Sequence, residues 1–392
     1  MDDVKAEFWG DLQADLFTAN SAVYLANQRL EDLVREDGRK AHKPILSHPQ
    51  VGTYTPHNDI TFEQKTATKQ TLEVDTFEYA AEDIDISEKR QTPYDLLAHS
   101  LMSIRKGLMN IVEQKFLSEV TNAFHSISGA PVEVSSANIL DILEEAEGKL
   151  GAFDAPYETV MRAAVLGPRT VAKLRRAKSD RESRLGDSVL ENGVVGPWQG
   201  WTVVQNNNLP WTGVLSMVTN PSDGDTVTIS GVVFEFQDDL ADVTAGNVGA
   251  LRHATTVDTS RLNLSKAINQ SGTVGTDHTA MSERQAFLLR RKRALTATND
   301  NTADTLTVTG YGDIAVSEAL TDTTDTWTSA KQDAVFMIRG AIDMVLQFMD
   351  LKIADKEKGF ADLPKGIIGV GTKTFSDGAD LMVHLQQDVS GF

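Results

Sequence analysis

Apolar residues recur at steps of three and four along two stretches of the chain, and this spacing predicts two amphipathic helices. The first stretch covers residues 7–36 and is followed by Gly38, a residue suited to a helix C-cap. The second covers residues 93–124, with Thr92 as its N-cap and Pro93 at the first helical position. A helix of this length, roughly 30 residues, would be ~45 Å long. We therefore expect a long helix in the first third of the chain.

The segment between these helices, residues 43–91, has a different pattern. Prolines break its first part, and polar and apolar residues then alternate through 71–79 and again through 83–86. Alternation with a period of two is typical of half-buried strands. The segment therefore predicts a long two-stranded excursion with its tip near residues 53–66. A hairpin this exposed needs a neighbour to cover its apolar side chains.

Helical and strand patterns then alternate, which indicates an α/β arrangement. The predicted elements are a helix at 136–150, a strand at 162–166, a helix at 170–177 and strands at 201–204, 334–339 and 381–385. We expect the strand at 334–339 to pair with the strand at 201–204, although more than a hundred residues separate them in sequence.

Residues 218–327 differ in composition from the rest of the chain. Thr, Asp and Gly dominate, and turns such as Asp223-Gly224-Asp225 separate short β-patterned runs. The predicted elements are strands at 226–229, 232–236 and 305–308 and helices at 262–268 and 283–289. This pattern predicts a self-contained insertion that folds by itself.

Composition narrows the possible chemistry. The chain has 392 residues, 37 Lys and Arg against 56 Asp and Glu, a net charge of −19 and no cysteine. Without cysteine there is no disulfide, thiolate nucleophile or Cys-ligated metal centre. The acidic balance disfavours a dedicated DNA-binding protein. The charged N-terminus does not resemble a signal peptide, and no window suits a membrane span, so we expect a soluble protein made in the cytoplasm.

Gly-rich and nucleophile motifs do not point to an enzyme. Residues 366–374 resemble a phosphate loop, but Thr372 separates Gly371 from Lys373, and a Gly-rich strand turn is the better interpretation. No HExxH or GxSxG motif and no Ser/His/Asp arrangement has a recognisable spacing. We therefore predict no catalytic residues.

Histidines and basic residues give equally weak signals. His42, His48 and His57 fall in a Pro-broken segment without a helical i, i+4 pair, which favours exposed histidines over a metal site. Two basic clusters, within 173–178 and at 290–293, are best interpreted as solvated faces or as salt-bridge patches between subunits in so acidic a chain. We predict no metal-binding and no cofactor-binding residues, and no cofactor.

The order of the segments resembles the major capsid proteins of tailed bacteriophages, which share the Hong-Kong-97 fold. The resemblance is carried by residues 72–91 entering the helix at Pro93, 164–168 before a helix, 196–206 with Leu209-Pro210, and the C-terminal run 360–388. It covers most of the chain outside the insertion. Within the insertion, residues 223–232 look like a β-module of other phage structural proteins.

The resemblance implies an α+β fold of the Hong-Kong-97 type: an N-terminal arm, an E-loop hairpin, a P-domain with a long spine helix, and an A-domain, here with an inserted β-rich domain. The implied segments are the arm 1–42, E-loop 43–91, P-domain spine helix region 92–135, A-domain first part 136–217, insertion 218–327, A-domain second part 328–350, P-domain return 351–375, and A-domain closing strand with the C-terminus 376–392.

The resemblance also implies a structural function, not an enzymatic one. The chain would assemble with itself, as hexamers and pentamers, into the icosahedral capsid that encloses double-stranded DNA. Scaffolding and portal proteins would be partners, with decoration proteins as a further candidate, and the packaged DNA would be bound weakly and non-specifically. The chain would assemble in the host bacterial cytoplasm, reside in the virion and contact no membrane. Lys65 and Lys69 are candidates for subunit cross-linking, but no matched motif supports that chemistry.

Two other readings stay open at this point. An encapsulin-like nanocompartment shell shares the fold but normally lacks such an insertion. An α/β enzyme could hold a metal through acidic residues such as Asp83 and Asp85, although these also fit the polar face of a strand.

Overall fold

The computed structural model describes residues 22–32, 34, 38–47, 51–54, 56, 59, 62–91, 96–152, 162–179, 200–252, 256–291, 293–355 and 361–389. The chain divides into two compact units, which we name for their main features. The hairpin unit comprises Ala26–Leu108 and Ile342–Ser376, and the sheet unit comprises Met1–Leu25, Met109–Ala341 and Asp377–Phe392.

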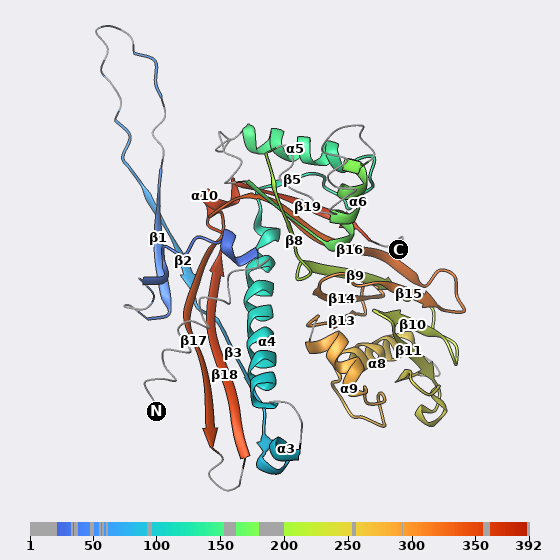
Figure 1. The fold of residues 1–392 in the computed structure, drawn as a ribbon. Coiled ribbons are helices and arrows are strands. Elements are labelled where there is room, and N and C mark those ends of the chain that lie inside the picture. The colour runs from blue at the N-terminus through green and yellow to red at the C-terminus, as the bar shows by residue number, and fades with distance from the viewer. Residues whose placement is uncertain are drawn as a thin grey trace. The chain divides into compact units, whose positions relative to one another are not determined.

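The hairpin unit contains two antiparallel sheets and the helices α3 and α4, the latter in part (Figure 1). Its elements are β1 (Lys40–Leu46), β2 (Ala67–Glu73), β3 (Thr76–Ala81), β4 (Ile84–Asp85), α3 (Ile86–Gln91), the first part of α4 (Leu96–Ser118), β17 (Asp343–Asp355) and β18 (Ala361–Lys373). Strands β1 and β2 pair with each other, and the second sheet has the order β17-β18-β3, with β4 also pairing with β18. The predicted excursion is therefore a β1–β2 hairpin.

One face of the β17-β18-β3 sheet packs against α4. Ile104 and Leu108 on α4 are buried, and Gly366 on β18 lies so close that a Cβ there would approach Leu108 to 2.8 Å. The absence of a side chain at Gly366 thus permits close packing of helix and strand. A second apolar cluster holds the base of the hairpin; its buried members are Val34, Ala41, Leu72, Val74, Val345 and Phe375.

The sheet unit contains a nine-stranded mixed sheet and a four-stranded sheet. Before the insertion its elements are η1 (Ala22–Leu25), the second part of α4, η2 (Glu119–Asn122), β5 (His125–Ser126), β6 (Val132–Glu133), α5 (Ile139–Gly151), β7 (Arg162–Leu166), α6 (Pro168–Ser179), β8 (Thr202–Gln205) and β9 (Pro210–Ser216). After it come β16 (Thr326–Ile338), α10 (Ser376–Ala379) and β19 (Met382–Asp388). The main path of the large sheet is β13-β14-β9-β16-β19-β5, and β7 joins β16 to β8.

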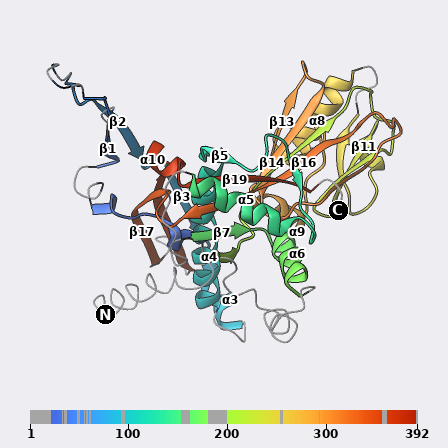
Figure 2. The same ribbon diagram turned by 90° about the horizontal axis from the view of Figure 1, so that it is seen from above.

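The segment predicted as an insertion supplies strands to both sheets of this unit (Figure 2). Its elements are β10 (Thr226–Ile229), β11 (Val232–Gln237), η3 (Leu240–Asp242), β12 (Val248–Leu251), α8 (Val257–Asn269), α9 (Glu283–Ala286), a π-helical turn η4 (Phe287–Arg291), β13 (Thr296–Asp300), β14 (Thr305–Tyr311) and β15 (Val316–Ala319). Strands β10, β11, β12 and β15 form the small sheet, whereas β13 and β14 extend the large sheet through β9.

One apolar core joins the two sheets. Phe234, Phe236 and Leu264 from the insertion share it with Trp211 and Leu215 on β9. The expectation that 218–327 is self-contained is therefore wrong in detail, because β9 completes both the sheet and the core of this segment.

Two further expectations about the strands differ from the structure. The strand at 334–339, part of β16, does not pair with β8; β7 lies between them, parallel to β8 and antiparallel to β16. Strand β7 is buried along its whole length and is paired on both sides, which satisfies its backbone. The pattern over 71–79 is not one strand but two, β2 and β3, which belong to different sheets.

Within the described residues, the predicted helices over 7–36 and 93–124 differ from the structure. Helix α4 has 23 residues and gives way to the 3-10 turn η2, while Thr92 and Pro93 lie outside the described residues. Most of the predicted helix over 7–36 lies outside them as well. Its described part is interrupted at Asn27, whose backbone pairs with Ile342 and Met344 at distances of 2.9 Å.

The predicted role of Gly38 as a helix C-cap agrees with its backbone geometry. Gly38 has a φ of +103° and its N–H donates to the carbonyl of Val34 at 3.1 Å, as in a helix C-cap. Residues 366–371 lie within the continuous strand β18 and therefore do not form a phosphate-binding loop.

A partly buried glutamate, Glu113, joins three parts of the sheet unit. Glu113 on α4 accepts hydrogen bonds from the backbone N–H of Ala22 at 3.0 Å and from the side-chain amides of Asn206 at 2.7 Å and Asn208 at 2.5 Å. Charge-assisted hydrogen bonds of this kind are stronger than neutral ones. Glu113 therefore anchors both η1 and the β8–β9 connection to α4.

A fragment of the insertion that lacks β9 should be unable to fold alone. We expect a fragment of residues 218–327 to lack a cooperative thermal transition, because it loses β9 and the burial of Trp211 and Leu215, worth ~1.5–3 kcal/mol each. A fragment of 209–332, which keeps β9 and the part of β16 that pairs with it, should melt cooperatively. Circular dichroism melting of both fragments tests this; equally sharp transitions would show that β9 is dispensable.

The substitution Glu113→Ala should lower the free energy of unfolding by about 2–4 kcal/mol, because it leaves buried donors of Asn206 and Ala22 without an acceptor. Amide exchange of residues 22–25 should accelerate in the same variant. The matched control is Glu119→Ala, which removes a bond to the exposed Asn122 and should cost less than about 1 kcal/mol. Chemical denaturation and hydrogen exchange measure both; an unchanged exchange rate at Ala22 would contradict the anchoring role.

Candidate assembly surfaces

The β1–β2 hairpin and the segment that joins its strands expose large apolar side chains to solvent. The two strands pair from Lys40 opposite Glu73 to Leu46 opposite Ala67, and Ser47 and Thr66 add a last pair of hydrogen bonds. Beyond this point the chain continues as an excursion. Its exposed large apolar side chains are Leu46, Val51, Tyr54 and Phe62, the last 89% exposed.

Within the unit, the hairpin strands are held at their base by the apolar cluster and by contacts such as Lys43 over the Phe375 ring at 5.0 Å. The Lys40–Glu73 ion pair spans 3.1 Å but is about half exposed, and His42 contacts the Thr71 hydroxyl at 2.9 Å. Exposed pairs of this kind contribute ~0–1 kcal/mol. An isolated two-stranded hairpin is marginal in water, so a surface that covered the outer part of the hairpin would stabilise it further.

A second surface is the outer face of the β17-β18-β3 sheet. Tyr79 on β3 lies opposite Ile367 on β18, and Phe77 lies two residues before Tyr79 on the same face. All three are exposed, Tyr79 by 77%. The Arg39 guanidinium lies 4.7 Å from the centre of the Phe77 ring and also donates to the carbonyl of Val74. This face therefore presents aromatic and aliphatic groups beside a cation, a composition typical of protein contacts.

The basic cluster on α6 does not form a free cationic patch. The Lys173 ammonium donates to the carbonyl of Val134 at 2.5 Å, and burial lowers the pKa of this lysine although Glu133 opposes the effect. Lys178 is buried, whereas Arg175 and Arg176 are exposed. Part of the cluster thus serves the interior of the sheet unit, and Arg175 and Arg176 form its exposed part.

The second cluster is divided in a similar way. Arg290 is exposed on the π-helical turn, whereas Arg293 donates to the backbone carbonyl of Asp313, and burial lowers the pKa of Arg293. Lys292 lies outside the described residues.

The residues considered for chemistry do not converge. Asp85 accepts from the backbone and hydroxyl of Ser87 at the start of α3, and Asp83 is exposed. His48 and His57 lie outside the described residues, and within the described part no group of three His, Asp or Glu side chains is arranged to hold a metal. Lys65 and Lys69 are exposed along the hairpin.

A cleft of about 420 Å³ lies on the outer face of the large sheet, lined in part by Thr212, Thr296, Thr309 and Tyr311. The charged group in its lining is Asp333, whose carboxylate is bound by His384 Nε2 at 2.8 Å. The cleft brings no nucleophile, base and oxyanion donor together in the manner of a catalytic site.

Sequence reasoning missed the polar side chains that hold the sheet unit together. Glu113 sits within an apolar helical pattern, and Arg261 and Asn269 recur at multiples of four on α8. The signal that could have revealed them is a polar residue on the helix face that should be buried.

No protein-family model matches the sequence, and no curated protein sequence matches it. No helix among the residues with defined positions is long and apolar enough to cross a membrane.

Solved phage structures do resemble the chain. A chain from Mycobacterium phage Che8 superposes with a TM-score of 0.55 at 12% identity, over 94% of this chain and 92% of that one. A chain in the capsid of cyanophage P-SCSP1u gives 0.49 at 11% identity, over 90% and 84%. A chain in the capsid of Ralstonia phage GP4 gives 0.45 at 9% identity, over 94% and 88%. At these identities the likeness is one of fold, and the first of the three confirms the predicted α+β fold of the Hong-Kong-97 type.

Proposed function

We propose that the chain is the major capsid protein of a tailed bacteriophage, which assembles with itself as hexamers and pentamers into an icosahedral shell around double-stranded DNA. The observation that carries the proposal is the fold: the similarity to the Mycobacterium phage Che8 chain extends over nearly the whole of both chains. Other matched chains come from capsids, such as that of cyanophage P-SCSP1u.

The exposed surfaces support this function on physical grounds. The β1–β2 hairpin and the outer face of the β17-β18-β3 sheet carry large apolar side chains that water solvates poorly, including Phe62 and Tyr79. Burying such surfaces between subunits would supply the large contacts of an obligate assembly, ~2,000 Å² or more. Each copy would thus complete its fold on its neighbours.

The segments take the roles that the fold family suggests. The β1–β2 hairpin acts as the E-loop within 43–91, and α4 with the β17-β18-β3 sheet forms the P-domain. The sheet unit around β16 forms the A-domain, and residues 218–327, completed by β9, form the inserted domain. The arm lies in residues 1–42, and the C-terminal residues 376–392 close the A-domain through β19.

The charge of the chain suits a container for DNA. A net charge of −19 limits tight binding of phosphates, so the packaged DNA contacts the shell weakly and non-specifically. Scaffolding, portal and decoration proteins are the expected partners. The protein acts mechanically, not as an enzyme; it assembles in the host bacterial cytoplasm and resides in the virion. The insertion favours this assignment over an encapsulin-like shell.

Assembly should depend on the exposed apolar groups of the hairpin. We expect the wild-type chain to form closed shells or rings of five and six subunits, and the variant Val51→Ser/Tyr54→Ser/Phe62→Ser to stay monomeric with an unchanged melting temperature, because these side chains make no core contact. Size-exclusion chromatography and negative-stain electron microscopy measure both. The control Leu262→Ser/Val274→Ser removes exposed apolar groups from the insertion and should assemble like the wild type.

A wild-type chain that remains monomeric at every concentration and salt condition would contradict self-assembly. Assembly of the triple hairpin variant at the wild-type level would instead remove the hairpin from the interface.

A further inference from the structure

The cleft on the outer face of the large sheet has a floor of hydroxyl groups. The strand register places Thr296 on β13 opposite Thr309 on β14, and Thr309 opposite Thr212 on β9. Residues that lie opposite each other in antiparallel strands point to the same face, so the three side chains form one row. The Thr296 and Thr309 hydroxyls contact each other at 2.8 Å. We call the hollow above this row, with a volume of about 420 Å³, the threonine cleft.

An aromatic ring and a carboxylate complete the lining. Tyr311 on β14 lies opposite Pro210 on β9, and Asp333 on β16 borders the same cleft. Burial raises the pKa of Tyr311, so its hydroxyl keeps its proton at neutral pH and can donate a hydrogen bond. Asp333 Oδ1 accepts from His384 Nε2 at 2.8 Å, and within the described residues this carboxylate forms no other hydrogen bond. Its second oxygen is therefore available to accept from a ligand.

The lining determines which class of ligand fits. Asp333 is the charged residue among the described residues of the cleft, so an anion would meet a carboxylate and no cation. An apolar ligand would remove water from the threonine hydroxyls without replacing its hydrogen bonds. A compact cation would contact Asp333 and leave most of the row empty.

A neutral sugar matches every part of this lining. Its hydroxyl groups can donate to the carboxylate, and they can both donate to and accept from the threonine hydroxyls. The C–H face of a sugar ring can pack on the apolar surfaces of Tyr311 and Pro210. The composition of the cleft therefore favours a carbohydrate.

The cleft continues past the edge strand of the sheet. A second hollow of about 450 Å³, lined by Ala286, Arg290 and Leu295, shares Ala294 and Thr296 with the threonine cleft. The two hollows form one groove that runs from β16 across β9, β14 and β13 to the π-helical turn η4. Neighbouring strands are ~4.8 Å apart, so a groove across these strands is longer than a single sugar ring. The shape therefore favours a chain of several sugar units.

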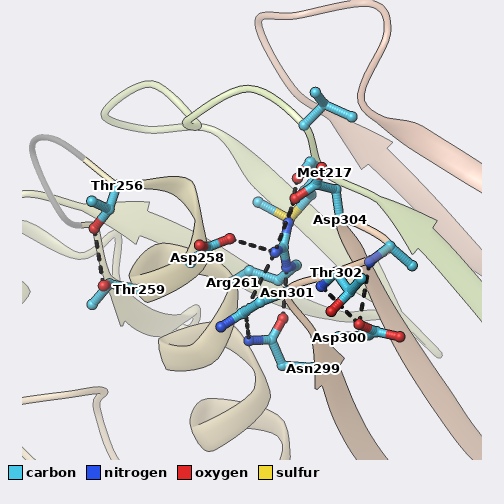
Figure 3. Close-up of polar contacts among 12 residues, drawn as sticks. Met217, Thr256, Asp258, Thr259, Arg261, Asn299, Asp300, Asn301, Thr302 and Asp304 are labelled. Atoms are coloured by element: carbon cyan, nitrogen blue, oxygen red, sulfur yellow. Dashed lines mark hydrogen bonds and ion pairs between the residues drawn. The ribbon is translucent and has the colours of Figure 1, made fainter.

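Helix α8 fixes β13, the strand at the end of the threonine row. The backbone of Ala297 on β13 is bonded by the side chains of Ser265 and Asn269 on α8. Arg261 on the same helix donates to the side chain of Asn299 on β13 at 2.6 Å (Figure 3). A surface that is fixed before binding loses less conformational entropy when its ligand binds. The floor of the groove is thus preformed.

We propose that the threonine cleft binds a neutral oligosaccharide. Asp333 accepts from the sugar hydroxyls, Tyr311 donates to them, and Thr212 does both. Glycoside hydrolysis generally uses a pair of carboxylates, and the described lining holds one, so the ligand is bound and not cleaved. The proposal concerns one surface of the sheet unit and does not depend on the proposed function.

Binding of sugars to the intact chain, in whatever oligomeric state it adopts, tests the proposal. The probes are maltotetraose, mannotetraose and N-acetylchitotetraose, and titrations followed by saturation-transfer difference NMR give their dissociation constants. We expect at least one probe to bind the wild type. Thr212→Val and Tyr311→Phe should each raise its dissociation constant about fivefold, because each removes one hydroxyl group and hardly changes the shape of the side chain.

Thr307→Val is the matched control, because Thr307 lies on the same face of β14 but outside the described lining of the cleft. It should bind the probe like the wild type. Circular dichroism melting checks that the variants fold, and Thr212→Val decides the outcome if Tyr311→Phe does not fold. Spermidine and sulfate should not compete with the sugar. Lack of binding by all three probes, equal dissociation constants for Thr212→Val and the wild type, or competition by either ion would overturn the proposal.

Discussion

The sheet unit depends on the backbone pairing of one strand, β16. Along one edge β16 pairs first with β9 and then with β7, and along the other it pairs with β19. A strand buried between two others must have its N–H and C=O groups bonded on both sides. Four segments distant in sequence are thereby brought to one sheet, and no local interaction could replace this arrangement.

The position of β16 explains why the inserted segment is not a separate body. The chain leaves the large sheet after β9 and returns to it as β16, and Asp325 closes the base by accepting from the backbone N–H groups of Val218 and Thr219 at 2.7 and 3.2 Å. Burial raises the pKa of Asp325, and those two hydrogen bonds oppose the rise. Since β14 also pairs with β9, the insertion and its host share strands and a core, and their stabilities are coupled.

The sequence predicted local elements well and long-range pairings poorly. Strands β7 and β10 have the predicted bounds, because β-branched and apolar runs between turn residues are local signals. The partner of β16 was predicted wrongly because β7 and β8 carry similar patterns, and pattern alone does not order strands within a sheet. The helix over 7–36 failed at Asn27 because a bond to the distant Ile342 overrides the local period.

Some features of the candidate surfaces could be predicted from the sequence, and others could not. Exposed apolar residues on the hairpin followed from its turn-rich, alternating sequence, since such a segment has too few partners to bury them. The polar anchors Glu113, Arg261 and Asn269 did not, because a polar residue within a helical pattern gives no indication of the backbone groups that it meets. Their partners lie up to 95 residues away, as between Glu113 and Asn208, and only the folded chain brings them together.

Surfaces made of apolar side chains and the backbone edge of β13 differ in their exposure. The β1–β2 hairpin and the face around Tyr79 have exposed apolar side chains, whereas the backbone of Ala297 on β13 is bonded by the side chains of Ser265 and Asn269 on α8. Side-chain surfaces differ in shape and chemistry, so they select particular partners, whereas a backbone edge fits any other edge, including its own copy. Specific association between proteins is therefore favoured when the first kind of surface is exposed and the second is closed. The polar side chains of α8 satisfy that requirement because they bond the backbone of β13 instead of merely covering it.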